Sequence, residues 1–142
     1  MPAASANDAT KNEVVHFDNK AELLRYLYAD LTRLNQVASP DIVLHCYDKA
    51  TSLYGIAAAQ AHEEALVAIT GGTLQMDIKA VDVSEEHGVV HGFIRAHKPG
   101  QEDLNMQFRG VWHFKDGKIV EHFEEIIGDP MELDKWLGSA GV

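Results

Sequence analysis

The sequence predicts a single α+β domain in which N-terminal helices cover one face of an antiparallel β-sheet. Apolar residues recur at helical spacing in the first half of the chain and alternate with polar residues in the second half. Helices followed by a run of strands indicate the α+β class and exclude the regular alternation of a Rossmann-type fold. A chain of 142 residues is also long enough to bury a substantial core.

The first predicted helix begins after Asn19, a suitable N-cap with Glu22 three residues later as its capping-box partner. It extends to a break at residues 39–41, and a short strand follows at residues 42–44. A second helix is expected from about residue 55 to about residue 70, where two glycines end it. The apolar stripe of the first helix consists of Leu24, Leu27, Tyr28, Leu31 and Leu34.

Strands are expected at residues 74–83, 88–97, 104–114 and 119–127. Asp116-Gly117, between the last two, is a strong hairpin signal, and a short helix follows Asp129-Pro130. Residues 1–12 show no periodicity, so we predict a flexible tail before one domain over residues 13–142. The clearest strand has a period of two, with one apolar face made of Leu104, Met106, Phe108, Trp112 and Phe114.

The composition argues against several classes of partner. A net charge of −10 disfavours nucleic acid and anionic membrane surfaces, because both attract basic proteins. No segment approaches the roughly 18 apolar residues of a membrane span, and Met1–Thr10 lacks the basic start and apolar run of a signal peptide. The single cysteine, Cys46, forms neither an intramolecular disulfide nor a Cys-based zinc site. We therefore expect a cytoplasmic protein.

Three segments resemble the motifs of a known family. Residues 29–31 with 40–45 resemble its N-terminal entry, residues 54–59 resemble the start of its next helix, and residues 111–124, VWHFKDGKIVEHFE, resemble its closing hairpin. The family is that of the SnoaL-like polyketide cyclases, and the similarity covers roughly residues 20–128. It lies within a superfamily that includes nuclear transport factor 2, ketosteroid isomerase and scytalone dehydratase. The resemblance implies a cone-shaped, cystatin-like fold, whose curved antiparallel sheet encloses an apolar pocket.

The resemblance also implies a catalytic role for Glu124, which occupies the position of the cyclases' proton-transfer carboxylate. His122 is two positions away on the same strand and therefore on the same face. In an apolar pocket the carboxyl group would have a raised pKa and could act as an acid or a base, with the imidazole as its partner. The alternative is that both side chains lie in solvent at the rim of the sheet.

A second carboxylate is expected near the mouth of the pocket. The position of the isomerases' catalytic base falls on Cys46, which is more typical of a small buried apolar residue. Asp48 has the same strand parity, so it is either a catalytic base or an ordinary loop residue.

The isomerases' oxyanion position, a histidine in the cyclases, falls on Gly110, which has no side-chain donor. A donor to a developing oxyanion would then have to come from His122, Tyr28 or Tyr47. The residues that we expect to bind substrate are Tyr28, Tyr47, Tyr54, Met106, Phe108, Gly110 and Trp112.

Neither a metal nor a cofactor is expected, although the chain has eight histidines. A catalytic zinc site usually has three protein ligands, and His122 with Glu124 supplies only two. The sequence contains no H-E-x-x-H spacing, no phosphate loop and no nucleotide fingerprint.

Two functional hypotheses follow. The first is a cofactor-free acid/base enzyme, a cyclase, isomerase or dehydratase, acting on a bulky, mostly apolar carbonyl compound such as a polyketide or terpenoid intermediate. The second is a non-catalytic module that binds a small molecule or dimerises; the missing side chain at Gly110 favours it, whereas His122 with Glu124 favours the enzyme. A homodimer is expected through the outer face of the sheet, where Val89, Phe93 and Val111 are exposed apolar residues.

Overall fold

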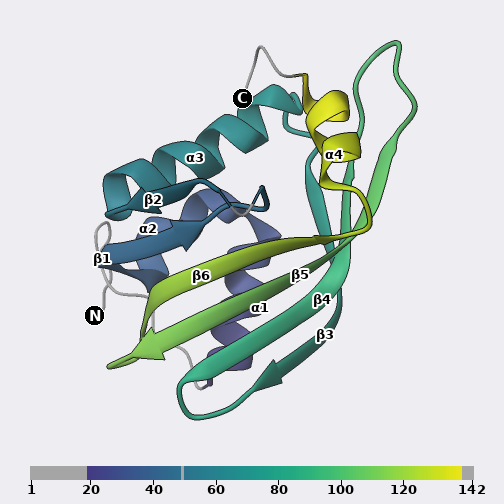
Figure 1. The fold of residues 1–142 in the computed structure, drawn as a ribbon. Coiled ribbons are helices and arrows are strands. Elements are labelled where there is room, and N and C mark those ends of the chain that lie inside the picture. The colour runs from purple at the N-terminus through teal and green to yellow at the C-terminus, as the bar shows by residue number, and fades with distance from the viewer. Residues whose placement is uncertain (1–18, 49, 139–142) are drawn as a thin grey trace, which may run out of the picture.

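A computed structural model describes residues 19–48 and 50–138 and confirms the predicted class, a curved sheet with helices on its concave side (Figure 1). The expected tail at residues 1–12 lies outside the described residues. The helices are α1 (Lys20–Ala29), α2 (Leu34–Val37), α3 (Ile56–Ile69) and α4 (Pro130–Leu137), with a 3₁₀ turn, η1 (Leu31–Arg33), between the first two. The strands are β1 (Ala38–His45), β2 (Ser52–Tyr54), β3 (Gln75–Val83), β4 (His87–Ala96), β5 (Leu104–Lys115) and β6 (Lys118–Ile127).

The six strands form one sheet in the order β2-β1-β6-β5-β4-β3. Strands β3 to β6 form the predicted antiparallel meander, and Asp116-Gly117 makes its last turn with positive φ at both residues. The sheet is not wholly antiparallel, because β1 pairs with β6 in parallel. This pairing joins the two ends of the domain and brings the short strand β1 beside the strand that carries Glu124.

The concave face of the sheet carries the core, as the period-two pattern predicts. Trp112 on β5 is 1% exposed, and Leu24 and Leu27 on α1 are fully buried against the sheet. Asn19 caps α1 as expected, because its side chain accepts a hydrogen bond from the Glu22 backbone N–H at 2.9 Å.

The first helix is shorter than the apolar stripe suggests. It ends at Ala29, because Asp30 has an extended backbone and its side chain accepts from the Thr32 N–H to start η1. Leu31 and Leu34 stay buried, but on separate short turns rather than on one continuous helix. An Asp side chain that accepts a hydrogen bond from a backbone N–H of the following turn favours the end of a helix over its continuation.

Helix α4 covers one end of the concave face, beside the end of β6 (Figure 1). Its apolar residues Leu133 and Leu137 are buried. Its C-terminal carbonyls are held from the β4–β5 loop, where Lys98 Nζ donates to Trp136 O at 3.1 Å and to Leu137 O at 2.7 Å. None of the helices in the described part of the chain is long and apolar enough to span a membrane.

Candidate active site

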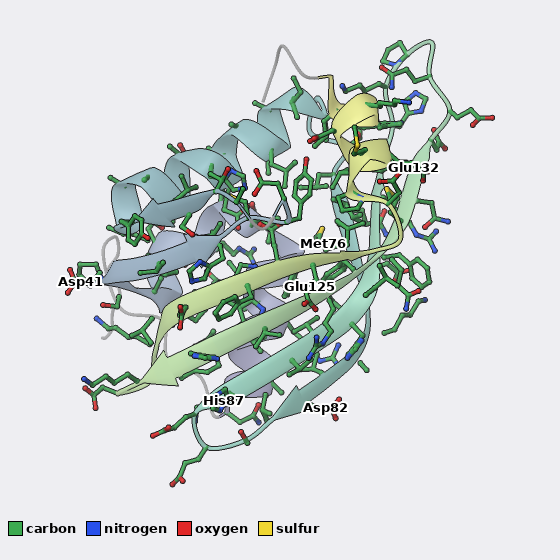
Figure 2. The ribbon with its side chains drawn as sticks, viewed as in Figure 1. Asp41, Met76, Asp82, His87, Glu125 and Glu132 are labelled. Carbon is green, nitrogen blue, oxygen red and sulfur yellow. The ribbon has the colours of Figure 1, made fainter. Side chains whose placement is uncertain are left out.

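The concave face, α3 and α4 enclose a pocket. Its apolar wall includes Leu31, Leu66, Met76, Ile94, Leu133 and Leu137, and Figure 2 shows Met76 inside this space, whereas Asp41, Asp82 and His87 lie at the periphery. Its aromatic wall is made of Tyr28, Tyr47, Phe108 and Trp112, and its polar groups include His62, Glu63, His122 and Glu124. The cavity volume is about 30 Å³, which is room for a few water molecules.

Glu124 projects from β6 into this pocket, as the resemblance implies. A quarter of its side chain is exposed (26%), but its Oε1 atom is buried and makes no hydrogen bond within the described residues. His62 Nε2 on α3 lies 3.8 Å from Glu124 Oε1, an ion-pair contact that is too long for a hydrogen bond. The Glu124 partner raises the pKa of His62 above its ordinary value.

Glu63 is a second carboxyl group in the pocket, and the sequence analysis did not identify it. Its side chain is 2% exposed, and its Oε1 is buried without a hydrogen-bond partner in the described residues. Its position in the sequence could have identified it as buried. Glu63 lies in α3 four residues after Ala59 and three residues before Leu66, and both of these residues are buried. A glutamate at that spacing interrupts the apolar stripe of the helix and therefore faces the core.

Two carboxyl groups in one apolar cavity cannot ionise equally, so their pKa values separate. Burial and the nearby Glu124 raise the pKa of Glu63 to about 8, so Glu63 holds a proton at neutral pH. Burial also opposes ionisation of Glu124, but the interaction with His62 outweighs it and lowers the pKa of Glu124. The group with the raised pKa is thus Glu63, and not Glu124 as the sequence suggested.

His122 lies beside this pair but has little freedom. It is 2% exposed, and its ring stacks on Trp112 with 3.5 Å between ring centroids. Its Nδ1 lies 3.1 Å from the Val111 carbonyl oxygen, an acceptor, so Nδ1 carries the hydrogen and Nε2 has the lone pair. Burial lowers the pKa of His122 to about 4, and the imidazole is therefore neutral at pH 7.

Tyr28 and Trp112 complete the inner wall. Trp112 Nε1 donates a hydrogen bond to the Tyr28 hydroxyl at 3.0 Å, and the two rings meet edge to face. The Tyr28 hydroxyl lies directly over Gly110, where a Cβ atom would be 2.3 Å from it. Burial raises the pKa of Tyr28 well above its ordinary value, so the hydroxyl stays protonated.

Of the other residues that we expect to bind substrate, some line the cavity and some do not. Phe108 and Tyr47 line the cavity, and the Tyr47 hydroxyl donates to Asp134 on α4. Met106 packs against the core without reaching the cavity wall, and Tyr54 is 72% exposed on the edge strand β2. Tyr54 therefore does not belong to the pocket.

Asp48 does not join the group either. Its carboxylate accepts from the backbone N–H groups of Ala50 and Thr51, each at 2.8 Å, and from the Thr51 hydroxyl at 2.7 Å. These hydrogen bonds lower the pKa of Asp48, which lies exposed in the β1–β2 turn. In the structure Asp48 holds that turn and is not among the residues that line the pocket. Cys46 is buried, and burial raises its pKa to about 12, so it behaves as an apolar residue.

His45 and His113 share Glu121 on the convex side of the sheet. His45 contacts Ser52 at 2.8 Å and Glu121 at 2.7 Å, and His113 Nδ1 lies 3.3 Å from the other Glu121 oxygen. No cluster of three or more metal-ligating side chains with suitable geometry occurs within residues 19–48 and 50–138.

Known structures share this architecture. Bal32a, from a soil-derived mobile gene cassette, is 22% identical and superimposes with a TM-score of 0.71 over 83% of this chain and 95% of that one. A protein described as a SnoaL-like polyketide cyclase, from Jannaschia sp. CCS1, is 15% identical, with a TM-score of 0.69 over 90% and 94% of the two chains. AclR, described as a hydroxylase, from Streptomyces galilaeus, is 21% identical, with a TM-score of 0.63 over 84% and 96%. These likenesses show the fold, the cystatin-like or NTF2-like cone.

Sequence comparison identifies the family directly. No curated protein matches the chain significantly. The model of the SnoaL-like domain matches residues 25–122, which is more than half of the chain and runs from α1 to His122. Because this match covers more than half of the chain, the chain belongs to the SnoaL-like domain family.

Proposed function

We propose that this protein is an acid/base enzyme that moves protons on a mostly apolar carbonyl compound, as an isomerase, cyclase or dehydratase does. One observation carries the proposal. Glu63 and Glu124 share an enclosed apolar pocket, and their environments favour opposite protonation states at neutral pH. Such a separation is what assigns acid and base roles to paired carboxyl groups in enzymes.

The chemistry needs no group beyond these side chains. The Glu124 carboxylate removes a proton from the carbon next to the carbonyl, and the electron pair of that bond moves to the carbonyl oxygen. Glu63 then gives its proton to another carbon, or to a leaving hydroxyl that departs as water. Proton return from Glu124 to Glu63 restores both groups, so an isomerisation leaves the proton count unchanged.

His62 is placed to exchange this proton with solvent. Its side chain is 20% exposed, and its Nε2 contacts the Glu124 carboxylate at 3.8 Å. An imidazole with one nitrogen near a buried carboxylate and partial access to water can relay protons between them. His62 thereby takes the partner role that the sequence assigned to His122, whose imidazole is stacked and neutral.

The ligand must displace part of the wall, because the cavity volume is only about 30 Å³. Helix α4 contributes Leu133 and Leu137 to the wall, and Gly128, with φ of +122°, precedes it. A bulky polyketide or terpenoid intermediate would enter when α4 moves outward. A family member described as a polyketide cyclase is consistent with this ligand class.

We further propose a homodimer through the convex face of the sheet, in the cytoplasm. Val89, Val111 and Phe123 lie side by side in register across β4, β5 and β6 and form an apolar row on that face. Phe123 is 36% exposed, and contiguous exposed apolar side chains often mark an interface. Buried Cys46, the single cysteine, suits a reducing compartment.

Deuterium exchange tests the acid/base proposal without knowledge of the product. A panel of cyclic ketones and enones is incubated with the protein in D₂O, and NMR follows exchange at the carbon next to the carbonyl. We expect the protein to accelerate exchange for at least one member and Glu124→Gln to abolish the acceleration. Binding of a panel member with no exchange above the buffer rate would favour the alternative, a non-catalytic binding module.

A further inference from the structure

A second cavity lies beside the proposed active site, at the edge of the sheet that β3 forms. Residues from the end of α1, from η1, from α3 and from the start of β3 line it, and we call it the outer cavity. Its volume is about 340 Å³, compared with about 30 Å³ for the inner pocket that holds Glu63 and Glu124. Sites for small molecules usually occupy about 300–1,000 Å³. The outer cavity therefore has room for part of a ligand, whereas the inner pocket alone does not.

Three residues line both cavities and form the wall between them: Tyr28, Leu31 and Met76. Tyr28 and Leu31 are buried in the core, whereas Met76 (Figure 2) is half-buried on the edge strand β3. Methionine has three rotatable bonds and adapts its shape to its surroundings. Met76 is therefore the part of this wall that can move aside with the smallest change to the core, and its movement would join the two cavities.

The outer cavity also contains a guanidinium group in a fixed position. Arg33 Nη1 donates to the Tyr26 backbone oxygen at 2.9 Å, and Arg33 Cζ lies 4.1 Å from the centroid of the Tyr26 ring. None of the ion pairs among residues 19–48 and 50–138 involves Arg33. A guanidinium has five N–H donors, so several remain for an oxygen atom of a ligand. Asp30 lines the same cavity and would repel an anion, so the arrangement favours an uncharged oxygen group.

We propose that the outer cavity is a second binding subsite, which receives an apolar chain that passes Met76 and ends in an uncharged oxygen group next to Arg33. The inference rests on the ligand-binding part of the proposed function, because the carbonyl end of the same ligand lies in the inner pocket beside Glu124. It does not depend on catalysis. It narrows the substrate class to elongated ketones that have a hydroxyl or a second carbonyl group at the far end.

A homologous series of methyl ketones, from 2-hexanone to 2-undecanone, tests whether the chain reaches the outer cavity. In the parent protein, calorimetric titration should show an affinity that rises roughly three- to fourfold with each added methylene through the whole series, because each methylene leaves water. In Met76→Trp, whose larger side chain fills the passage, the rise should stop at the shorter members. Met131→Trp makes the same substitution at a methionine that is 65% exposed on α4, and it should leave the full rise intact.

Met76→Ala tests the passage in the opposite direction and keeps the test decisive if Met76→Trp is poorly folded. The smaller side chain widens the passage between the cavities. A ketone with a benzene ring in the middle of its chain should therefore gain roughly 10-fold in affinity, relative to 2-undecanone, when the variant is compared with the parent protein. An unchanged preference between the two ketones would show that the chain does not pass Met76.

The oxygen group at the far end is tested with 11-hydroxy-2-undecanone and 2-undecanone, which differ only in the terminal hydroxyl. The ratio of their affinities should fall roughly 10-fold in Arg33→Met, which keeps an unbranched side chain but removes the donors. Arg25→Met, at an exposed arginine of α1 that lines neither cavity, should leave the ratio unchanged. An equal ratio in Arg33→Met and the parent protein would overturn the role of Arg33.

The binding measurements need no turnover, so they separate the subsite from the acid/base function. An affinity that stops rising at short ketones in the parent protein, or a rise that Met76→Trp leaves intact, would overturn the subsite even if deuterium exchange occurs. A rise that depends on Met76 without any deuterium exchange refutes only the acid/base function. Failure of every ketone in the series to bind would refute both the ligand class and the subsite.

Discussion

Glu63 on α3 and Glu124 on β6 line one cavity, and each has a buried Oε1 without a hydrogen-bond partner in the described part of the chain. Buried polar atoms are nearly always paired in native proteins, so these two carboxyl oxygens are distinctive polar groups in an otherwise mostly apolar wall. The two groups differ in their surroundings, because the His62 imidazole lies 3.8 Å from Glu124 Oε1, whereas no ion pair with Glu63 occurs within the described residues. This asymmetry gives the site its predicted pH behaviour.

The turnover rate should depend on pH through both carboxyl groups. The base, Glu124, must be ionised, and its pKa is lowered, so activity should persist below the ordinary titration range of a glutamate. The acid, Glu63, must be protonated, so kcat should fall as the pH rises through about 8. A pH–rate profile measures both limbs. In Glu63→Gln the limb near pH 8 should disappear, and its survival would assign that limb to another group.

Removal of the proposed base should abolish turnover while the fold persists. Glu124→Gln keeps the shape of the side chain but cannot accept the proton, so kcat should fall roughly 10²–10⁴-fold. The affinity for the ligand should change little. Steady-state kinetics and calorimetric titration measure the two quantities.

Asp48→Asn is the matched control, since the structure places this carboxylate in the β1–β2 turn. It should leave kcat unchanged and change the stability little, because the side-chain oxygen of asparagine can still accept hydrogen bonds from the backbone of the turn. A large loss of kcat in Asp48→Asn would restore it to the catalytic group. His122→Phe, which can keep the stack on Trp112, should reduce kcat less than His62→Phe does.

The stability of the protein should also report the burial of Glu63. Its pKa in the folded protein is about 8, compared with 4.5 for an ordinary glutamate. The folded state thus holds a proton that the unfolded state releases above about pH 4.5, so this group's contribution declines as pH rises from about 4.5 to about 8. The total decline is up to about 5 kcal/mol.

Urea unfolding of the protein and of Glu63→Gln, at about pH 5 and about pH 8.5, measures this contribution. The variant cannot titrate at this position, so its stability relative to the parent should increase between the two pH values. Other titrating groups, such as His122, are present in both proteins, so their effect on the pH dependence of stability cancels when the two proteins are compared. An equal pH dependence in the two proteins would mean that Glu63 is ionised in the folded state.

Local patterns in the sequence predicted most of the fold. The period-two strand at residues 104–114 buries Trp112, and the Asp-Gly turn and the Asn19 cap are present, because each depends on neighbouring residues. The early end of α1 at Ala29 was missed, since the apolar stripe continues past it. The parallel pairing of β1 with β6 joins segments far apart in the chain, and no local signal encodes it.

The site was less predictable for the same reason. Glu124 and the aromatic wall followed from strand parity and family resemblance, but Glu63 was hidden by the usual exposure of glutamate on helices. The contact between Tyr28 and Trp112 spans 84 positions in the sequence, and only the fold brings the hydroxyl over Gly110. From the sequence, Gly110 indicated that a side-chain hydrogen-bond donor is missing at this position. In the structure the Tyr28 hydroxyl occupies the space beside Gly110.

The convex face should make the protein a dimer. Its apolar row, Val89, Val111 and Phe123, lies at the centre of the sheet, and polar residues flank it on both sides. A twofold axis through this row would place each apolar side chain against its equivalent in a second copy. Sedimentation should therefore show a dimer at micromolar concentration, and Val111→Glu should dissociate it, because two like charges would meet near the axis. Tyr54→Glu, on the exposed edge strand β2, is the matched control and should remain dimeric. A parent protein that sediments as a monomer would contradict the predicted dimer. A Val111→Glu variant that stays dimeric would show that the dimer does not form through this face.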